Sequence, residues 1–297
     1  MNETLKRFFS ALIAIGLSLG CFYCEFYLFY WIVVTNVCLL EFSQSVHDVS
    51  NNNPLHFVFS VISMISYYTF IQNFNIFILV TYFMWLAFIS IVLQDPSISV
   101  MSVFSVVWIV YPLHVCFLIS SKDIESMLVF LTLIWITDAG AYFFGKFLGR
   151  TPFFQNISPK KTLEGTVGGI FTSYITRVII SYYFPQYRTP TWIFLTFVAS
   201  IGGQFGDLFE SLIKRSVSVK DSGNVMPGHG GLLDRMDSVF FAVVIGQYFL
   251  LYNNVISINN ILTIEDLKNY LISLIETDYI GVFGYLYEKF INMIIDI

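Results

Sequence analysis

Residues 127–147 read MLVFLTLIWITDAGAYFFGKF, and this stretch decides the fold class of the chain. A helix needs about 20 mostly apolar residues to cross roughly 30 Å of hydrocarbon. The stretch has that length, and its only charged residues are Asp138 near the middle and Lys146 near the end. It therefore predicts a membrane-spanning helix.

Other apolar runs of similar kind lie on both sides of this stretch. We predict further spans at residues 55–71, 76–93, 98–119, 166–184, 191–206 and 238–255. The first run, residues 8–40, would make a helix of about 50 Å at a rise of roughly 1.5 Å per residue, which is too long for one crossing. We interpret it as two short spans with Glu25 at the outer tip between them.

The composition agrees with a membrane protein. Of the 297 residues, 56% are hydrophobic and 12% are charged, whereas a soluble domain carries roughly 25% charged residues. A soluble protein with an unusually apolar core is the alternative, but the apolar residues lie in long runs rather than at amphipathic spacing. The sequence has no basic stripe typical of nucleic-acid binding. We predict an all-α, polytopic transmembrane helical protein in the lipid bilayer, without a nucleic-acid partner.

Basic residues indicate which loops face the cytosol. Two basic clusters are separated by two predicted spans, so they lie on the same side; they comprise Lys146, Arg150, Lys160 and Lys161, and Lys214, Arg215, Lys220 and Arg235. Lys6 and Arg7 join them in the cytosol if an even number of spans precedes Gly149. The resulting arrangement has about nine spans, with the N-terminus inside and the C-terminus outside.

This arrangement predicts three regions of the chain. Residues 1–125 form N-terminal transmembrane helices, and residues 126–256 form a catalytic transmembrane domain with the active site in its cytosolic-side loops. Residues 257–297 form a C-terminal extension in which Ile264, Leu267, Leu271 and Leu274 recur at helical spacing. That spacing indicates an amphipathic helix on a membrane surface.

The presence of Asp138 inside a predicted span requires an explanation, because a charge within the membrane is costly. It stands in the segment Thr137-Asp138-Ala-Gly-Ala-Tyr142. A functional site is one interpretation, and a buried aspartate neutralised by protonation or hydrogen bonds is the other. The small residues that follow Asp138 also suit close helix packing.

Residues 158–169, SPKKTLEGTVGG, form the second polar segment. Lys160, Lys161 and Thr162 precede a glycine-containing helix start. Backbone amides at a helix N-terminus, together with lysine, make a natural phosphate site. A cytosolic loop whose lysines merely anchor it at the membrane is the alternative.

Residues 202–238, GGQFGDLFESLIKRSVSVKDSGNVMPGHGGLLDRMDS, form the third and densest segment. Helical spacing places four polar residues on one face, namely Asp207, Glu210, Ser211 and Lys214, and does the same for Asp234 and Asp237. Paired carboxylates at a membrane surface can hold Mg²⁺, which prefers oxygen ligands and substrate phosphates. Four basic side chains would meet phosphate charge, namely Lys214, Arg215, Lys220 and Arg235. A salt-bridged juxtamembrane loop is the alternative.

These residues by themselves indicate metal-assisted chemistry on a phosphate at the cytosolic face. A transporter or channel, with Asp138 and Arg177 on an ion path, is a competing interpretation. It predicts charges spread through several spans and a repeat of the two halves. The unusual polar residues instead gather in the second half of the chain.

The stretch Ser211–Asp237 resembles the signature of the phosphatidate cytidylyltransferase (CDP-diacylglycerol synthase) family, bacterial type. The matching elements are Ser211-Leu-Ile-Lys-Arg215, Lys220-Asp-Ser-Gly223, Pro227-Gly-His-Gly-Gly231 and Asp234-Arg-Met-Asp237. Met226 stands where Leu, Ile or Phe is usual. The segments around Asp138 and Lys160 also resemble the family's upstream motifs. A CDP-alcohol phosphotransferase is a weaker alternative because its Asp-Gly-x-x-Ala-Arg motif is absent, and the glycine-rich turn argues against a polyprenyl-phosphate transferase.

The resemblance implies a membrane enzyme that transfers the cytidylyl group of CTP to phosphatidic acid, giving CDP-diacylglycerol and pyrophosphate. It implies catalytic roles for Lys214, Arg215, Lys220, His229, Arg235 and Asp138. It implies substrate contacts by Lys160, Lys161, Thr162, Glu164, Ser211, Gly230 and Gly231, and a Mg²⁺ site at Asp207, Asp221, Asp234 and Asp237. It further implies a homodimer in the bacterial inner membrane, with the active site facing the cytosol.

Overall fold

The computed structural model describes residues 16–47, 97–155, 157–219, 221–223, 225 and 230–252, together with the single positions 84, 88 and 91. The chain divides into two compact units, Met1–Leu251 and Tyr252–Ile297. The predicted spans at 55–71 and 76–93 lie almost wholly outside the described residues, as does the predicted amphipathic helix beyond residue 257.

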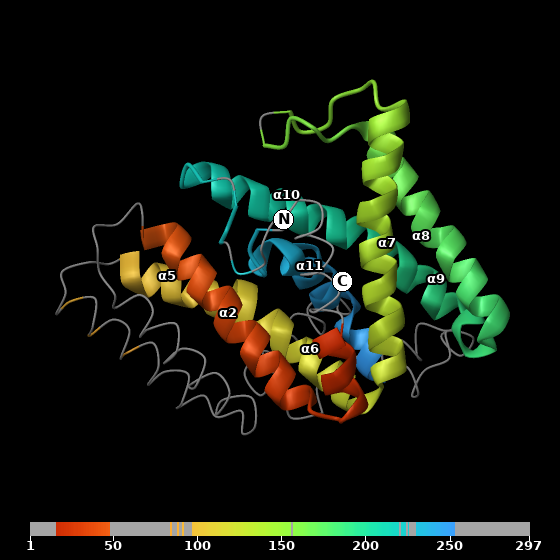
Figure 1. Cartoon of the computed structure of the whole chain (residues 1–297), viewed down its shortest axis with the longest axis horizontal. Helices are drawn as coiled ribbons and strands as arrows, with labels where there is room; N and C mark the ends of the chain where they lie inside the picture. Colours follow the sequence, from red (N-terminus) through yellow and green to blue (C-terminus); the bar gives the residue numbers. More distant parts are fainter. Residues whose placement is uncertain are drawn as a thin grey trace, which may run out of the picture. The chain divides into compact units, whose positions relative to one another are not determined.

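The described part of the chain is helical (Figure 1). Its elements in chain order are α2 (Tyr27–His47), α5 (Ser97–Ser105), η1 (Val106–Val110), α6 (Tyr111–Lys122), α7 (Ile124–Leu148), α8 (Leu163–Tyr183), η2 (Pro185–Arg188), α9 (Pro190–Phe197), η3 (Val198–Gly202), α10 (Gly203–Ser216) and α11 (Leu233–Tyr252). Within these residues the only β-type pairing is an isolated antiparallel bridge between Pro152 and Thr162. The predicted all-α class is therefore confirmed.

Four of the described helices are long and apolar enough to cross a membrane: Tyr27–Ser45, Val100–Lys122, Ile124–Leu148 and Pro190–Ser216. They match predicted spans, although the last helix continues ten residues beyond the predicted end at residue 206. The predicted spans at 166–184 and 238–255 are helical for most of their length, as α8 and α11. The count of nine spans stays a prediction.

The long first run is broken where the sequence predicted a hairpin. Residues 16–23 are helical, a turn follows at Cys24 and Glu25, and α2 begins at Tyr27. Glu25 has a φ of 58°, in the left-handed region that a side chain rarely adopts. The predicted break at Glu25 is confirmed, while the two membrane crossings on either side of it and the side of the membrane on which this turn lies stay predictions.

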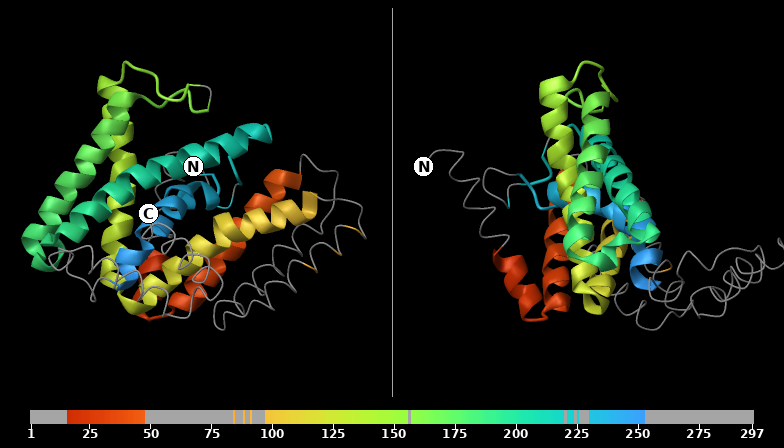
Figure 2. Two further views of the ribbon diagram at one scale, coloured as in Figure 1. Left: turned by 180° about the vertical axis from the view of Figure 1, so that it is seen from behind. Right: turned by 90° about the vertical axis from the view of Figure 1, so that its right-hand side faces the viewer.

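Helices α7 and α8 run side by side and pack closely (Figure 2). Small residues make this possible, because a Cβ on Gly169 would lie 2.7 Å from the Thr137 carbonyl oxygen. A Cβ on Gly165 would lie equally close, at 2.7 Å, to the Ala141 carbonyl oxygen. Close backbone approach of this kind is typical of packed membrane helices. It places the end of α7 beside the beginning of α8.

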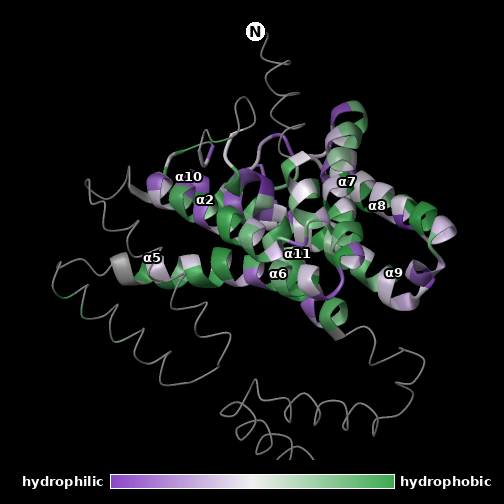
Figure 3. Ribbon diagram, turned by 60° about the horizontal axis from the view of Figure 1, so that its bottom comes forward, coloured by the Kyte–Doolittle hydropathy of each residue, from purple (hydrophilic) through white to green (hydrophobic). Residues whose placement is uncertain are grey.

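Aromatic rings join α2, η1, α10 and α11 into one core. Trp108 contacts Phe42, Phe209 and Phe240 with ring centroids 5.7–5.8 Å apart in edge-on geometry. Such pairs add stability beyond the apolar area that they bury. Figure 3 shows α5 and α6 as largely hydrophobic, whereas hydrophilic residues gather around α10 and the upper end of α7. The core thus holds together the helices that carry the polar side chains.

Candidate active site

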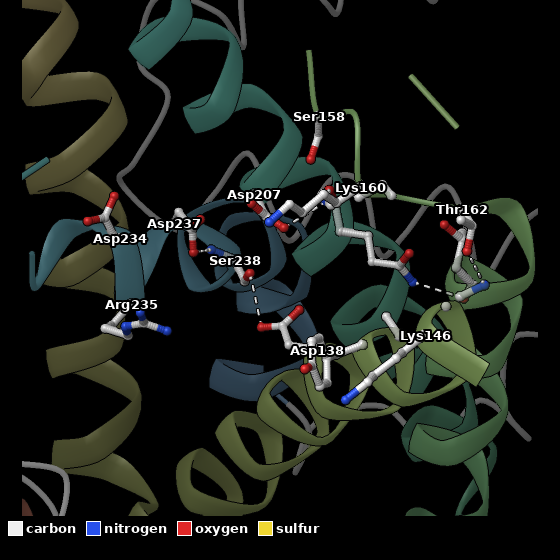
Figure 4. Close-up of a pocket in the computed structure, with 17 residues that line it drawn as sticks. Asp138, Lys146, Ser158, Lys160, Thr162, Asp207, Asp234, Arg235, Asp237 and Ser238 are labelled. Carbon is white, nitrogen blue, oxygen red and sulfur yellow. Dashed lines mark hydrogen bonds and ion pairs between the residues drawn. The ribbon is translucent and has the colours of Figure 1, made fainter. Parts of the chain in front are cut away.

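One pocket collects polar residues from five parts of the chain (Figure 4). Its volume is about 640 Å³. It is lined by Asp138, Ala141, Tyr142, Gly145 and Lys146 of α7, by Ser158, Lys160, Lys161 and Thr162 of the following loop, by Gly165 and Thr166 of α8, by Gln204 and Asp207 of α10, and by Asp234, Arg235, Asp237 and Ser238 of α11. Four aspartates and four basic side chains therefore share one cavity.

Helix α7 contributes one face to this pocket. Asp138, Ala141 and Gly145 are spaced by three and four residues, so they lie on one side of the helix. The Asp138 Oδ2 atom accepts a hydrogen bond of 3.3 Å from the Ser238 hydroxyl of α11. The site interpretation of Asp138 is therefore supported by its position, since this intramembrane aspartate faces the other polar groups.

The loop between α7 and α8 is held in a hairpin by backbone bonds and by Glu164. The Phe153 amide donates to Lys161 at 2.9 Å, and the Leu163 amide donates to Thr151 at 3.0 Å. The Glu164 carboxylate accepts bonds from the amides of Arg150 and Thr151 and from the Thr151 hydroxyl, at 2.8–3.1 Å. Hydrogen bonding, from the Arg150 amide first, lowers the pKa of Glu164 to about 2.

The start of α8 is capped by its own residues. The Thr162 hydroxyl accepts a hydrogen bond of 3.2 Å from the Gly165 amide, which is ordinary N-cap geometry. Since the Leu163 amide is also taken, by Thr151, these two donors are not available to a phosphate. The expectation that backbone amides at this helix start bind phosphate is therefore corrected for Leu163 and Gly165. Lys160 and Lys161 still line the pocket and are available for a phosphate group.

Lys161 joins this loop to α10. Its Nζ lies 2.7 Å from the Asp207 Oδ2 atom and 3.4 Å from the Gln204 carbonyl oxygen. The Gln204 side-chain amide in turn donates to the Thr166 carbonyl at 3.2 Å. A cation and a carboxylate therefore face each other at the pocket wall.

Asp234 is the best connected carboxylate at the edge of the pocket. Lys214 Nζ lies 2.6 Å from its Oδ1 atom and 2.8 Å from Glu210. The Ser222 amide donates to Asp234 at 3.1 Å and the Gly231 amide donates at 2.9 Å. Burial acts to raise the pKa of Asp234, but the Lys214 ion pair and these amides lower it overall. Asp234 is thus held as a charged carboxylate.

Glu41 is a member of this network that the sequence did not reveal. It belongs to α2, its side chain is 1% exposed, and its carboxylate accepts bonds from the amides of Leu232 and Leu233 at 3.0 and 2.8 Å. Leu232 and Leu233 follow Glu41 in the chain by 191 and 192 residues. The only local signal was an acid directly after an apolar run, which gives no indication of its partner.

The structure brings many of the predicted site residues together. Those that line the pocket are Asp138, Lys160, Lys161, Thr162, Asp207, Asp234, Arg235 and Asp237. Those that are described but do not line it are Glu164, Ser211, Lys214, Arg215, Asp221, Gly230 and Gly231. Lys220 and His229 lie outside the described residues. Nine lining residues had no predicted role in the site, namely Ala141, Tyr142, Gly145, Lys146, Ser158, Gly165, Thr166, Gln204 and Ser238.

The pocket offers oxygen ligands suited to a hard cation, because four aspartates line it. Within the described residues, no three His, Cys, Asp or Glu side chains are grouped closely enough to hold a metal by themselves. Asp234 already binds Lys214 and two amides, and Asp221 is exposed outside the pocket. The donors fit a metal such as Mg²⁺, which is bound by one or two carboxylates together with substrate phosphates.

Comparison with known proteins agrees with this site. The family model described as "Cytidylyltransferase family" matches residues 5–253. Phosphatidate cytidylyltransferase of Staphylococcus aureus (strain COL) is 45% identical over 125 residues, which are 41% of this chain and 48% of that protein. The protein of the same name from Staphylococcus haemolyticus is 42% identical over the same shares. The match spans about half the length of these curated relatives. Because the family model covers most of its length, the chain belongs to the cytidylyltransferase family.

Proposed function

We propose that this chain transfers the cytidylyl group of CTP to phosphatidic acid, giving CDP-diacylglycerol and pyrophosphate. The observation that carries the proposal is the single pocket in which four aspartates and four basic side chains meet among membrane-length helices. A triphosphate needs such positive charge, and a lipid substrate needs a site beside the bilayer. The names of the staphylococcal relatives support the same reaction.

In the proposed reaction, a phosphate oxygen of phosphatidic acid forms a bond to the α-phosphorus of CTP. The bond from that phosphorus to the oxygen bridging to the β-phosphorus breaks, and pyrophosphate leaves. This chemistry needs no enzyme nucleophile, so the protein acts mainly by positioning and charge neutralisation. Lys160, Lys161 and Arg235, which line the pocket, would bind the phosphates of the two substrates.

A divalent metal, Mg²⁺ by the chemistry of the donors, would neutralise charge on the triphosphate when bound. Asp207 and Asp237 are the lining residues that we propose as its ligands, because Asp234 is engaged by Lys214 and by two backbone amides, whereas Asp207 has one lysine partner, Lys161. Asp138 would orient the substrates from α7. We further propose that the enzyme works as a homodimer in the bacterial cytoplasmic membrane, with this pocket open to the cytosol.

The test uses the full chain, purified in detergent, with radiolabelled CTP, phosphatidic acid and Mg²⁺. Label is followed into the lipid phase with and without EDTA, and diacylglycerol serves as the control acceptor. We expect EDTA-sensitive label in lipid with phosphatidic acid and none with diacylglycerol. No label from a preparation that is folded and binds CTP would overturn the proposed function.

The metal assignment has its own test in the same assay. Asp207→Asn and Asp237→Asn each remove one proposed ligand while keeping the side-chain volume. We expect each to lower activity by at least about a hundredfold, because charge stabilisation at a transferring phosphoryl group is worth several kcal/mol. Normal activity and normal Mg²⁺ dependence in both variants would contradict the assignment.

A further inference from the structure

Glu41 of α2 binds the start of α11 across the longest sequence separation in the site. Its Oε1 atom accepts the Leu232 amide at 3.0 Å, and its Oε2 atom accepts the Leu233 amide at 2.8 Å. These are the first donors of α11, which have no partner inside their own helix. A buried carboxylate also suits the positive end of the helix dipole. Glu41 therefore caps α11 from a different helix.

The same helix also holds the other end of the loop that leads into α11. The Ser222 hydroxyl lies 3.4 Å from Glu41 Oε2, and the Ser45 hydroxyl donates to the Ser222 carbonyl at 3.1 Å. Residues 222 and 232–233 are thus bound to one turn of α2. Helix α2 contributes no residue to the pocket lining, but it binds both ends of the segment that leads into α11.

Two glycines of the loop are fitted to this carboxylate. A Cβ on Gly223 would lie 2.7 Å from Glu41 Oε1, and a Cβ on Gly231 would lie 2.5 Å from Oε2. A Cβ atom at either distance would force neighbouring atoms to move. Both residues can lie this close to Glu41 because glycine has no side chain. The fit gives a physical reason for glycine at both positions that does not involve substrate.

The pinned segment continues directly into pocket residues. Asp234 and Arg235, which follow Leu233, line the pocket. Asp234 also accepts the amides of Ser222 and Gly231, so it binds the same segment as Glu41 through different donors. The direction in which Asp234 and Arg235 leave the start of α11 is consequently set by two carboxylates, one local and one from α2.

We propose that Glu41 is a positioning residue for the transfer reaction, because its buried carboxylate holds Ser222 and the amides of Leu232 and Leu233 and thereby aims Asp234 and Arg235 into the pocket. The kinetic part of this inference rests on the proposed function, whereas its structural part does not. Through Glu41, the N-terminal helices contribute to a site whose lining residues all lie between Asp138 and Ser238.

The test is Glu41→Gln in the full chain, with Glu25→Gln as the matched control, since Glu25 is an exposed acid at the preceding helix turn. Glutamine places a donor against one of the two amides and removes the charge. We expect kcat to fall roughly tenfold, which is the loss of a charged hydrogen bond. KM for phosphatidic acid should change less than about twofold, because the residues that bind substrate are misaligned rather than lost. Amide exchange in 221–233 should become faster, and Glu25→Gln should match wild type throughout.

A second variant covers the case in which Glu41→Gln does not fold. Ser222→Ala removes one contact with Glu41, and we expect a fall in kcat of about threefold with faster exchange in 221–233. In the double variant the two effects should be less than additive in free energy, since both act through one loop.

Wild-type kcat and wild-type exchange in the folded Glu41→Gln protein would overturn the proposal, as would the same result for Ser222→Ala if Glu41→Gln is unfolded. A wild-type chain that transfers no label would defeat the proposed function instead. In that case amide exchange in 221–233 still decides whether Glu41 holds the loop.

Discussion

At the scale of single residues, the carboxylates of this site fall into two groups. Glu41, Glu164 and Asp234 have their oxygens engaged by backbone amides, so they hold loops in place. Asp138 faces the pocket and contacts Ser238, whereas Asp207 faces it and contacts Lys161 and Ser211. Carboxylates of one site therefore hold loops in some cases and are available for chemistry in others.

Asp234→Asn is expected to destabilise the protein at neutral pH by roughly 2–4 kcal/mol, because it removes one of the two carboxylates that pair with Lys214 and the charged acceptor of the Ser222 and Gly231 amides. The pKa of Asp234 is lowered in the folded state. Its contribution is therefore complete above the unfolded value of about 3.9 and is lost as the pH falls through the folded value. Thermal unfolding in detergent at pH 7 and at about pH 3 measures the effect, and the difference from wild type should shrink at the lower pH.

Asp221→Asn is the control for this measurement, because Asp221 is exposed in the same loop. We expect its unfolding temperature to match wild type within error at both pH values. An Asp234→Asn protein as stable as the control at pH 7 would show that the Lys214 ion pair does not contribute to folding.

At the scale of helices, the crossing of α7 and α8 sets the geometry of the pocket. The two helices contribute lining residues from adjacent ends, with Gly145 of α7 and Gly165 of α8 both in the pocket wall. Glycines along the crossing admit no Cβ, as at Gly169 beside the Thr137 carbonyl. The polar lining is thus positioned by close packing of two backbones rather than by long side chains.

Gly169→Ala is expected to lower the free energy of unfolding by about 1–3 kcal/mol, because the new methyl group overlaps backbone that cannot move freely. Its Cβ would meet the Thr137 oxygen at 2.7 Å and the Ala141 Cβ at 3.1 Å. Gly20→Ala is the matched helical control, since nothing lies within 4 Å of a Cβ there. The measurement is the thermal unfolding temperature of both variants. Equal unfolding temperatures would mean that α7 and α8 do not pack as closely at Gly169 as the structure shows.

At the scale of the whole chain, the distribution of charge predicts the side of the membrane on which the pocket opens. The α7–α8 loop and the start of α11 both carry basic residues, and both line one pocket. Basic loops remain on the cytosolic side. The predicted arrangement therefore places Gln155 in the cytosol and Glu25, at the turn before α2, on the opposite side.

Cysteine labelling tests this orientation. In a chain whose four native cysteines are replaced, Gln155→Cys and Glu25→Cys each add one exposed thiol. A membrane-impermeant maleimide should label position 155 only in inside-out vesicles and position 25 only in right-side-out vesicles. Labelling of both positions from the same side would contradict the two-span interpretation of residues 8–40.

The sequence alone determined the helical class, the hairpin at Glu25, and the segments from which the pocket is built. Hydropathy and helical spacing depend on neighbouring residues, so they can be recognised without a partner in view. Asp138, Lys161, Asp207 and Asp237 were accordingly predicted as site residues, and the structure places all four in one pocket.

Only the tertiary structure decided which polar groups hold loops and which face the cavity. Glu41 lies 192 residues from the Leu233 amide that it binds, and Thr162 caps the helix start that was expected to receive phosphate. These roles depend on which donors come within about 3 Å after folding. That distance is set by the packing of α2, α7, α8 and α11, and no local pattern of residues records it.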